Sequence, residues 1–188
     1  MLGRLVANGL ARSSRRFASA SLPPSRKRLL IVYHSLTGGS LQMAEAAAKA
    51  ARREPDLLVD LRHASAAGPE DVLSAHGYLF CGPETLASIS GVLKDFFDRS
   101  YYPVLGQVNG RPYAVLVCAG SDGTNATRQL ARIAAGWRLK QICEPLIVCT
   151  RADSPDKILA QKIIPSSDLA HCEEIGATLA AGLVMGVF

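Results

Sequence analysis

The sequence predicts an α/β fold with three layers, in which helices cover both faces of a doubly wound, five-stranded parallel sheet. Three observations favour this class. Five short segments carry apolar runs, as expected of strands buried in a sheet. Segments with helical character alternate with them, which is typical of a parallel sheet. Finally, 48% of the 188 residues are hydrophobic, enough for one domain with a sizeable core.

The expected elements alternate regularly along the chain. Strands are expected over residues 28–34, 56–63, 77–82, 111–120 and 142–150. Helices are expected over residues 40–54, 68–75, 91–101, 125–139 and 166–185. Ser40 is expected to be the N-cap of the first helix. Pro145 predicts that the fifth strand lies at an edge of the sheet or contains a bulge.

The apolar stretch at the end of the chain predicts a packed helix rather than a membrane span. "IGATLAAGLVMGVF" has 14 residues and follows two acidic residues, Glu173 and Glu174. A span needs about 20 apolar residues. No membrane span is therefore expected.

The basic character of the chain comes from its N-terminus. The formal net charge is +5, but residues 1–28 hold seven Lys and Arg residues, and the first acidic residue is Glu45. The rest has 14 basic and 16 acidic residues, a net charge of −2. The sequence therefore does not predict a nucleic-acid partner.

Residues 1–27 have the composition of a targeting segment. They are rich in Arg, Ser and Ala, with spaced apolar residues, and "RRFASA" resembles a cleavage region. This pattern is typical of a mitochondrial or plastid transit peptide, and the alternative is a disordered basic tail of a bacterial protein. We expect a mitochondrial matrix location in the first case and a cytoplasmic one otherwise. Residues 28–188 then form the folded domain.

The five cysteines predict neither disulfides nor a metal site. Cys81, Cys118, Cys143, Cys149 and Cys172 are odd in number and mostly lie in apolar segments. Buried free thiols in a reducing compartment are expected. No Cys/His pair has the spacing of zinc ligands.

Three loops that are rich in small and hydroxyl-bearing residues follow the first, third and fourth strands. They cover Ser35–Ser40, Pro83–Ser90 and Ala119–Thr124. In a doubly wound sheet, ligands bind beyond the carboxyl ends of the strands, where the strand order reverses. The three loops are therefore expected to form one binding site.

The first of these loops favours a single terminal phosphate. Gly38 and Gly39 allow a close backbone approach, hydroxyl groups are available as donors, and the start of a helix attracts anions. A nucleoside triphosphate loop would need a lysine where Gly39 stands, and the G-x-G-x-x-G dinucleotide pattern is missing.

Three stretches resemble known proteins. "YHSLTGGSLQMA" resembles the phosphate-binding segment of flavodoxin-like proteins. "GYLFCGPETLASISGVLKDFFDRSYYP" and "CAGSDGTNATRQLARIAAGWRLK" resemble the next two loop and helix regions of flavodoxin-fold NAD(P)H-dependent FMN reductases and quinone oxidoreductases. The resemblance runs from about Arg28 to Thr150, with the three loops in the same order.

The resemblance implies a flavodoxin-like fold with FMN as cofactor. It implies that the phosphate lies on the first loop and the isoalloxazine ring lies between the other two. No catalytic residue is implied, because the redox chemistry belongs to the flavin. The residues expected to bind the cofactor are Ser35, Leu36, Thr37, Gly38, Gly39, Ser40, Pro83, Glu84, Thr85, Leu86, Ala87, Ser88, Ala119, Gly120, Ser121, Asp122 and Gly123.

The chain departs from flavodoxins in one respect, because the ring loops contain no aromatic residue. Leu86 is expected to cover one face of the ring instead. Tyr101 and Tyr102 are candidates to reach the site from another subunit of a homo-oligomer, as in similar oligomeric proteins. A less enclosed ring suits hydride exchange with a nicotinamide or a quinone.

Several other residues have two readings, one functional and one structural. His34 is a candidate general base, but we expect a polar residue that meets solvent at a strand end. Glu84 either acts on the flavin or a nearby residue, or is an exposed loop acid. Asp122 is expected to form a turn with Gly123, while Phe96, Phe97 and Trp137 are expected to pack helices onto the sheet.

The sequence thus predicts an FMN-dependent oxidoreductase that transfers hydride from NAD(P)H to a quinone or another small acceptor. One alternative is a flavodoxin-type electron carrier without a substrate of its own, although such carriers are usually strongly acidic. The other is a flavodoxin-fold interaction module that has lost its cofactor.

Overall fold

The computed structural model describes residues 26–188. A parallel sheet forms its centre, with β1 (Lys27–Tyr33), β2 (Leu57–His63), β3 (Gly77–Thr85) and β5 (Pro112–Ala119) in the order β2-β1-β3-β5. Two short strands, β6 (Lys140–Gln141) and β7 (Leu146–Cys149), both pair with β5 in parallel at the edge. The strand order reverses between β1 and β3, so the predicted doubly wound α/β fold is confirmed.

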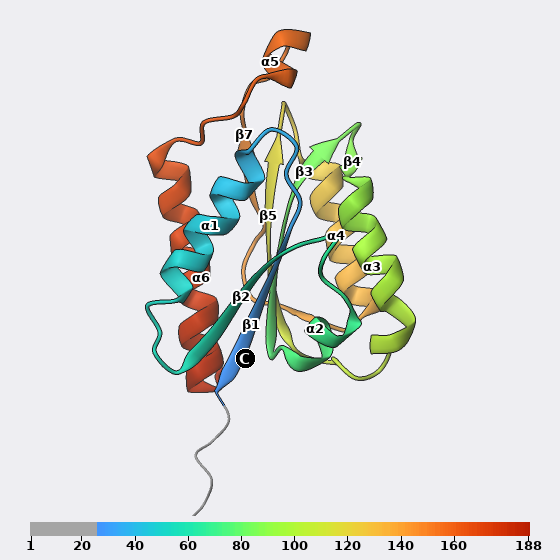
Figure 1. Ribbon diagram of the computed structural model, residues 1–188, viewed down its shortest axis with the longest axis vertical. Coiled ribbons are helices and arrows are strands. Elements are labelled where there is room, and N and C mark those ends of the chain that lie inside the picture. The colour runs from blue at the N-terminus through green and yellow to red at the C-terminus, as the bar shows by residue number, and fades with distance from the viewer. Residues whose placement is uncertain (1–25) are drawn as a thin grey trace, which may run out of the picture.

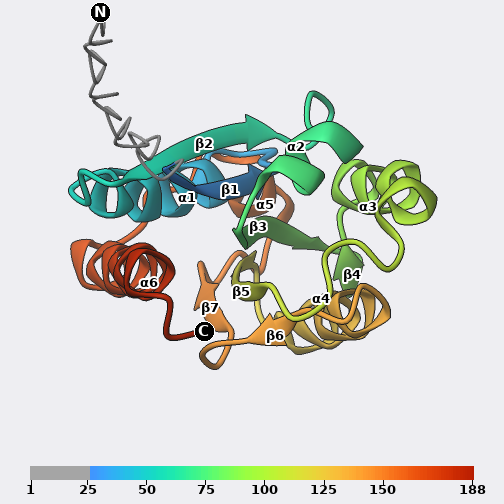
Figure 2. The ribbon, with the colours of Figure 1, turned by 90° about the horizontal axis from the view of Figure 1, so that it is seen from below.

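Helices cover both faces of this sheet (Figures 1 and 2). α1 (Gly39–Ala51) and α6 (Ser166–Met185) lie on one face. α2 (Pro69–Ser74), α3 (Gly91–Val104) and α4 (Thr124–Gly136) lie on the other. A sixth, short helix, α5 (Pro155–Leu159), lies beyond the upper edge of the sheet. The three predicted layers are therefore present.

The two faces of the sheet have different cores because successive strand residues point in opposite directions. Tyr78 and Phe80 of β3 face α3 and α4, where the Phe80 and Phe97 rings meet edge to face at 4.9 Å. Trp137 is buried in the same cluster, so its predicted packing role, like that of Phe96 and Phe97, is confirmed. The opposite face is covered by the alanine-rich side of α1 and by α6.

Close contact between α1 and α6 explains the apolar end of the chain. A Cβ atom placed on Gly176 would lie 2.2 Å from the carbonyl oxygen of Ala47, so only glycine lets the two helices approach this closely. The expected packed helix over 166–185 is present. Among residues 26–188, no helix has the length and apolar character needed to cross a bilayer.

Three local predictions were wrong in detail. The N-cap of α1 is Gly38, with Ser40 inside the first turn, because the loop enters the helix through a left-handed residue with a φ of 86°. The fifth strand is split into β6 and β7 before and after Pro145, which lies at the edge as expected. Cys149 is exposed and Cys143 half-buried, although all five thiols are free. The expected transit peptide lies almost entirely outside the described residues.

Candidate functional site

The three loops singled out in the sequence meet at the carboxyl edge of the sheet. β1, β3 and β5 are adjacent and parallel, so the segments that follow them lie side by side at the top of the molecule (Figure 1). We call Ser35–Ser40 the phosphate loop, Pro83–Ile89 the hairpin and Ala119–Gly123 the β5–α4 loop. This is the edge at which doubly wound folds bind ligands.

The phosphate loop has the features of an anion site. No side chain caps the first turn of α1, and that turn contains no acidic residue. The hydroxyl oxygens of Ser35 and Ser40 are buried without a hydrogen-bond partner. Buried hydroxyl groups are rarely left unpaired, and these two are at a helix start that favours negative charge. The loop therefore fits a phosphate group.

The second loop is a hairpin rather than an irregular loop. β3 continues to Thr85 and pairs antiparallel with β4 (Ser88–Ile89). The two turn residues, Leu86 and Ala87, have φ values of 49° and 56°. Side chains other than Gly, Asn and Asp seldom adopt this left-handed conformation. The turn therefore carries strain, which the contacts of the hairpin with α4 must offset.

Glu84 joins the hairpin to the β5–α4 loop. Its carboxylate accepts a hydrogen bond from the backbone N–H of Gly123 at 2.7 Å, while its second oxygen is buried without a partner. Gln129 of α4 also accepts bonds from the Ser88 hydroxyl and the Ile89 backbone N–H. Of the two readings of Glu84, the structure thus supports pairing with a neighbouring residue over an exposed loop acid. The hairpin and the loop are therefore joined into one wall.

A cavity of about 360 Å³ opens between these loops. Ten of its lining residues were predicted from the sequence: Leu36, Thr37, Pro83, Glu84, Thr85, Leu86, Ala87, Ala119, Gly120 and Ser121. The lining contains no aromatic side chain, as the sequence of the loops indicated. The predicted covering residue, Leu86, lines the cavity but is 98% exposed. The Leu86 side chain therefore lies at the mouth of the cavity and does not fill it.

The other predicted residues lie beside this cavity. Ser35, Gly38, Gly39 and Ser40 belong to the adjoining phosphate loop. Ser88 is bonded to Gln129 and Gly123 to Glu84. Asp122 is exposed, follows a bend at Gly120 and Ser121, and accepts a hydrogen bond from the Thr124 hydroxyl. The cavity and the phosphate loop together make up the candidate site.

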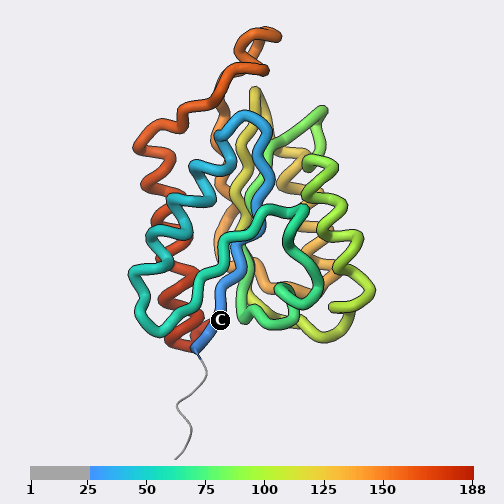
Figure 3. Tube along the Cα trace, viewed as in Figure 1, coloured from blue at the N-terminus to red at the C-terminus, as the bar shows by residue number. Residues whose placement is uncertain are grey.

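Part of the cavity wall was missed in the sequence. Cys118, at the end of β5, and Thr150, Ala152, Ile158 and Lys162 also line it. The last four belong to the segment between β7 and α6, residues 150–165, which we call the α5 segment. Figure 3 shows this segment rising past the sheet edge and returning towards α6. Its polar composition gave no local sign of a binding role.

The α5 segment is fastened to the phosphate loop. The backbone N–H of Lys162 donates to the carbonyl oxygen of Thr37 at 2.8 Å. The side chain of Gln42 donates to the carbonyl oxygens of Gly38 and Lys162, and it accepts from the backbone N–H of Ile164. One side of the candidate site is therefore built by residues more than a hundred positions after the phosphate loop.

His34 does not meet solvent, contrary to the sequence-based expectation. It is only 6% exposed, and its Nδ1 atom lies 2.7 Å from the hydroxyl oxygen of Ser90, the residue before α3. Burial, and then the neighbouring His63, lower the pKa of His34 below its usual value. The ring is absent from the cavity lining. His34 therefore anchors the start of α3 behind the site.

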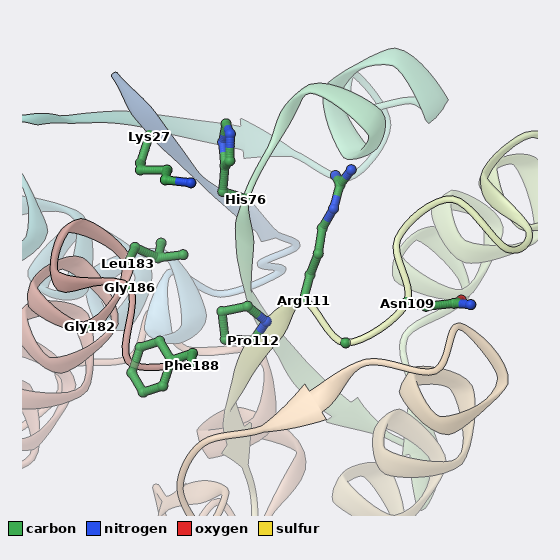
Figure 4. A pocket seen from close by; sticks show the side chains of 10 residues that line it. Lys27, His76, Asn109, Arg111, Pro112, Gly182, Leu183, Gly186 and Phe188 are labelled. Carbon is green, nitrogen blue, oxygen red and sulfur yellow. The ribbon is translucent and has the colours of Figure 1, made fainter. Parts of the chain in front are cut away.

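A second cavity, of about 260 Å³, lies at the opposite edge of the sheet (Figure 4). Lys27, His76 and Arg111 line it together with Leu183 and Phe188. The Arg111 guanidinium points away towards α2, where it donates to the carbonyl oxygens of Val72, Leu73 and Ala75. This cavity is remote from the three loops. Within residues 26–188, no three His, Cys, Asp or Glu side chains gather in a group suited to a metal ion.

Fold and site together define a flavodoxin-like protein whose loop at the start of α1 fits a phosphate group. Its sequence matches the NADPH-dependent FMN reductase family over residues 28–150. The chain belongs to this family. FMN is accordingly its cofactor, and NAD(P)H-dependent oxidoreduction is the class of reaction that the family defines.

Two curated relatives match part of the chain. A flavodoxin of Aquifex aeolicus is 33% identical over 95 residues, which cover 50% of this chain and 49% of the relative. An NAD(P)H dehydrogenase (quinone) of Acidithiobacillus ferrooxidans is 31% identical over 93 residues, with 39% of this chain and 46% of the relative covered. The match thus spans about half the length of these relatives.

Solved structures show the same fold at low sequence identity. A flavodoxin from the domain Archaea has a TM-score of 0.68 and 15% identity, and covers 84% of this chain and 99% of its own. A flavodoxin, WrbA-like protein from Agrobacterium tumefaciens has a TM-score of 0.63 and 19% identity, with 85% and 98% covered. The flavodoxin-like fold implied by the resemblance is confirmed.

Proposed function

We propose that this protein transfers hydride from NAD(P)H to a quinone or another small acceptor. The observation that carries the proposal is the open, aliphatic cavity beside the phosphate loop, whose lining contains no aromatic side chain. A ring that no aromatic residue covers leaves a face on which a nicotinamide or a quinone can stack. The similarity to an NAD(P)H dehydrogenase (quinone) supports this choice of acceptor.

Each part of the site has a definite task in this function. FMN, when bound, supplies the hydride chemistry, and the protein binds and orients it. The unpaired hydroxyls of Ser35 and Ser40 donate to the phosphate. Glu84 fixes the hairpin against the β5–α4 loop, so the walls keep their spacing. The walls also exclude water from part of the cavity, while one side stays open for the second substrate.

The experiment is a flavin spectrum followed by a turnover assay. Purified protein is titrated with FMN, and oxidation of NADH and of NADPH is then measured with a soluble quinone. Steady oxidation that requires both FMN and quinone supports the proposal. Reduction of the bound flavin without turnover would contradict it. A variant with Ser100→Ala, a buried position on α3 outside the cavity lining, is the matched control and should turn over normally.

A flavodoxin-type electron carrier is the second candidate. The observation in its favour is the 33% identity to a flavodoxin. A carrier passes electrons to a docked protein, and docking of this kind usually relies on strong charge complementarity. The net charge of −2 outside residues 1–28 gives little of it. Flavin reduced by a ferredoxin-type reductase, with no oxidation of NAD(P)H by quinone, would favour the carrier.

The location in the mitochondrial matrix is also a proposal, which rests on the Arg-rich, acid-free composition of residues 1–28. A fluorescent protein fused to residues 1–30 tests it. Import into mitochondria supports the proposal, and diffuse cytoplasmic fluorescence would contradict it.

A further inference from the structure

The phosphate loop contains no positively charged side chain that could pair with the phosphate of FMN. The terminal phosphate of FMN carries up to two negative charges, yet residues 35–40 contain neither Lys nor Arg. Ser35 and Ser40 offer neutral donors, and the helix start adds only a partial positive charge. Among the residues that line the adjoining cavity, one is cationic, and that residue is Lys162.

Lys162 is held directly against the phosphate loop. Its backbone N–H is bonded to the carbonyl oxygen of Thr37 at 2.8 Å. A Cβ atom placed on Gly39 would lie 3.3 Å from the Cβ atom of Lys162 and 2.6 Å from the sulfur of Cys118. Since the lysine stem is a flexible chain of four methylene groups, its ammonium group can reach the ligand side of the loop.

The charge of Lys162 already acts on the cavity wall. Burial raises the pKa of Cys118 to about 11, and the ammonium of Lys162 opposes that rise. Cys118 lines the same cavity. The backbone contact of Lys162 with Thr37 and the place of Lys162 in the cavity lining together put a cationic side chain at the boundary between the phosphate loop and the cavity.

We propose that the ammonium group of Lys162 binds the phosphate of FMN and so supplies the charge that the phosphate loop lacks. Lys162 lies beyond residues 28–150, the part of the chain that matches the family, so membership of the family does not assign it this role. The proposal rests on FMN as cofactor and does not depend on the identity of the electron acceptor.

The present bonds of the ammonium group are compatible with this role. Its Nζ atom donates to the carbonyl oxygens of Lys157, Ile158 and Ala160, at 2.6, 2.9 and 2.7 Å. These carbonyls are at the end of a short, exposed helix, where water can replace a lost bond. A bond to a phosphate is charge-assisted on both sides and stronger than a bond to a neutral carbonyl. Binding of FMN is therefore expected to draw the ammonium towards the phosphate.

The test compares FMN with riboflavin, which has the same ring but no phosphate. Affinities of the full chain and of Lys162→Met are measured by quenching of flavin fluorescence. Lys162→Met is expected to weaken FMN binding about tenfold or more, as the loss of a charge-assisted hydrogen bond implies. Riboflavin binding should change less than about twofold, because an uncharged ligand gains little from the ammonium. Lys162→Arg should keep most of the FMN affinity.

Lys157→Met is the matched control. It removes one charge from the same α5 segment, and Lys157 is absent from the lining of the 360 Å³ cavity and paired with Asp153. Its FMN affinity should equal that of the full chain. FMN binding by the full chain should also weaken with added salt more steeply than binding by Lys162→Met.

Two outcomes overturn the inference. Equal loss of both flavins in Lys162→Met would show that Lys162 only holds the α5 segment in place. Unchanged FMN affinity would show that the phosphate does not need this charge. If Lys162→Met does not fold, Lys162→Gln takes its place in the comparison. A full chain that binds no FMN would instead refute the cofactor itself, so the two failures are distinguishable.

Discussion

Ser35 and Ser40 have buried hydroxyl groups with no partner in the protein. Such a group loses its bonds to water and gains nothing in return unless a ligand accepts a hydrogen bond from it. The two positions are therefore unfavourable for the empty protein and favourable for a phosphate complex. Beside a helix start that favours negative charge, this combination is expected of phosphate-binding residues.

Ser40→Ala is expected to weaken FMN binding about tenfold, because one hydrogen bond to a charged phosphate is lost. The free energy of unfolding without FMN should not fall, because the hydroxyl makes no bond there. Fluorescence titration and urea unfolding measure the two quantities. Ser100→Ala is the control, since its hydroxyl is also buried and unpaired but is remote from the cavity. A similar loss of affinity in both variants would refute the role of Ser40.

The lowered pKa of His34 predicts how the free energy of unfolding depends on pH. Its pKa is lowered from 6.5 in the folded protein by burial and by His63. Below about pH 6.5 the unfolded chain therefore binds more protons than the folded one. Stability from this residue is fully present above that pH and is lost as the pH falls through the lowered pKa. We expect the free energy of unfolding to decrease between pH 7 and pH 5.

His34→Gln should make that decrease shallower in urea unfolding at several pH values. Some dependence should remain, because burial, with Lys27, Arg111 and Arg28, lowers the pKa of His76 as well. His171→Gln, on the exposed side of α6, is the control and should follow the original curve. If the free energy of unfolding of His34→Gln falls with pH as steeply as that of the original protein, His34 does not cause the decrease.

At the scale of elements, the local sequence pattern predicted the strands and the long helices. It did not predict two features that shape the cavity, the hairpin turn and the α5 segment. The turn at Leu86 and Ala87 lacks the Gly or Asn that marks such turns. Hydrogen bonds to the β5–α4 loop and to α4 hold the turn in place. They join Gly123 to Glu84, Ile89 to Gln129, and Asn125 to the Ala87 carbonyl oxygen. These contacts join residues about 40 positions apart, so no local window contains them.

The α5 segment was missed for the same reason. Its place is fixed by the bond from Lys162 to Thr37 and by the side chain of Gln42, which span more than a hundred positions. The phosphate loop, by contrast, carries its own signal, since its glycines and hydroxyls follow a buried strand directly. Local pattern was therefore enough to single out the phosphate loop, but it singled out only part of the residues that line the cavity.

Gly123 should be sensitive to a single methyl group. Its φ is 85°, and an added Cβ would lie 2.5 Å from a methyl carbon of Ile147. Gly123→Ala is therefore expected to lower the free energy of unfolding by about 1–3 kcal/mol. It should also weaken FMN binding, because the bond from Gly123 to Glu84 holds the two walls together.

Gly136→Ala is the control for this prediction. Gly136 ends the same helix, has an ordinary φ and has open space around its Cα. The replacement should raise stability by about 0.5 kcal/mol, since alanine loses less backbone freedom on folding. Urea unfolding with and without FMN checks both variants. If the two glycine variants behave alike, the hairpin and the β5–α4 loop are not coupled in the way proposed.

At the scale of the whole molecule, the candidate site draws on both halves of the chain. The phosphate loop follows the first strand, and Lys162 precedes the last helix. The sheet between them is continuous, and its two cores lie back to back on the same strands. The walls of the cavity are thus attached to one sheet, and binding is expected to be linked to global unfolding.

FMN at a hundred times its dissociation constant should stabilise the folded protein by about 2.7 kcal/mol. For a domain of this size, that corresponds to a rise in melting temperature of about 5–10 °C. Calorimetry should show one unfolding transition, and FMN should raise its melting temperature. This follows because a ligand that binds only the folded state shifts the whole folding equilibrium. Ser40→Ala at the same FMN concentration should show a smaller rise, since its dissociation constant is about ten times higher and FMN then stabilises it by only about 1.4 kcal/mol. Two transitions, of which FMN moves only one, would instead mean that the site unfolds apart from the sheet.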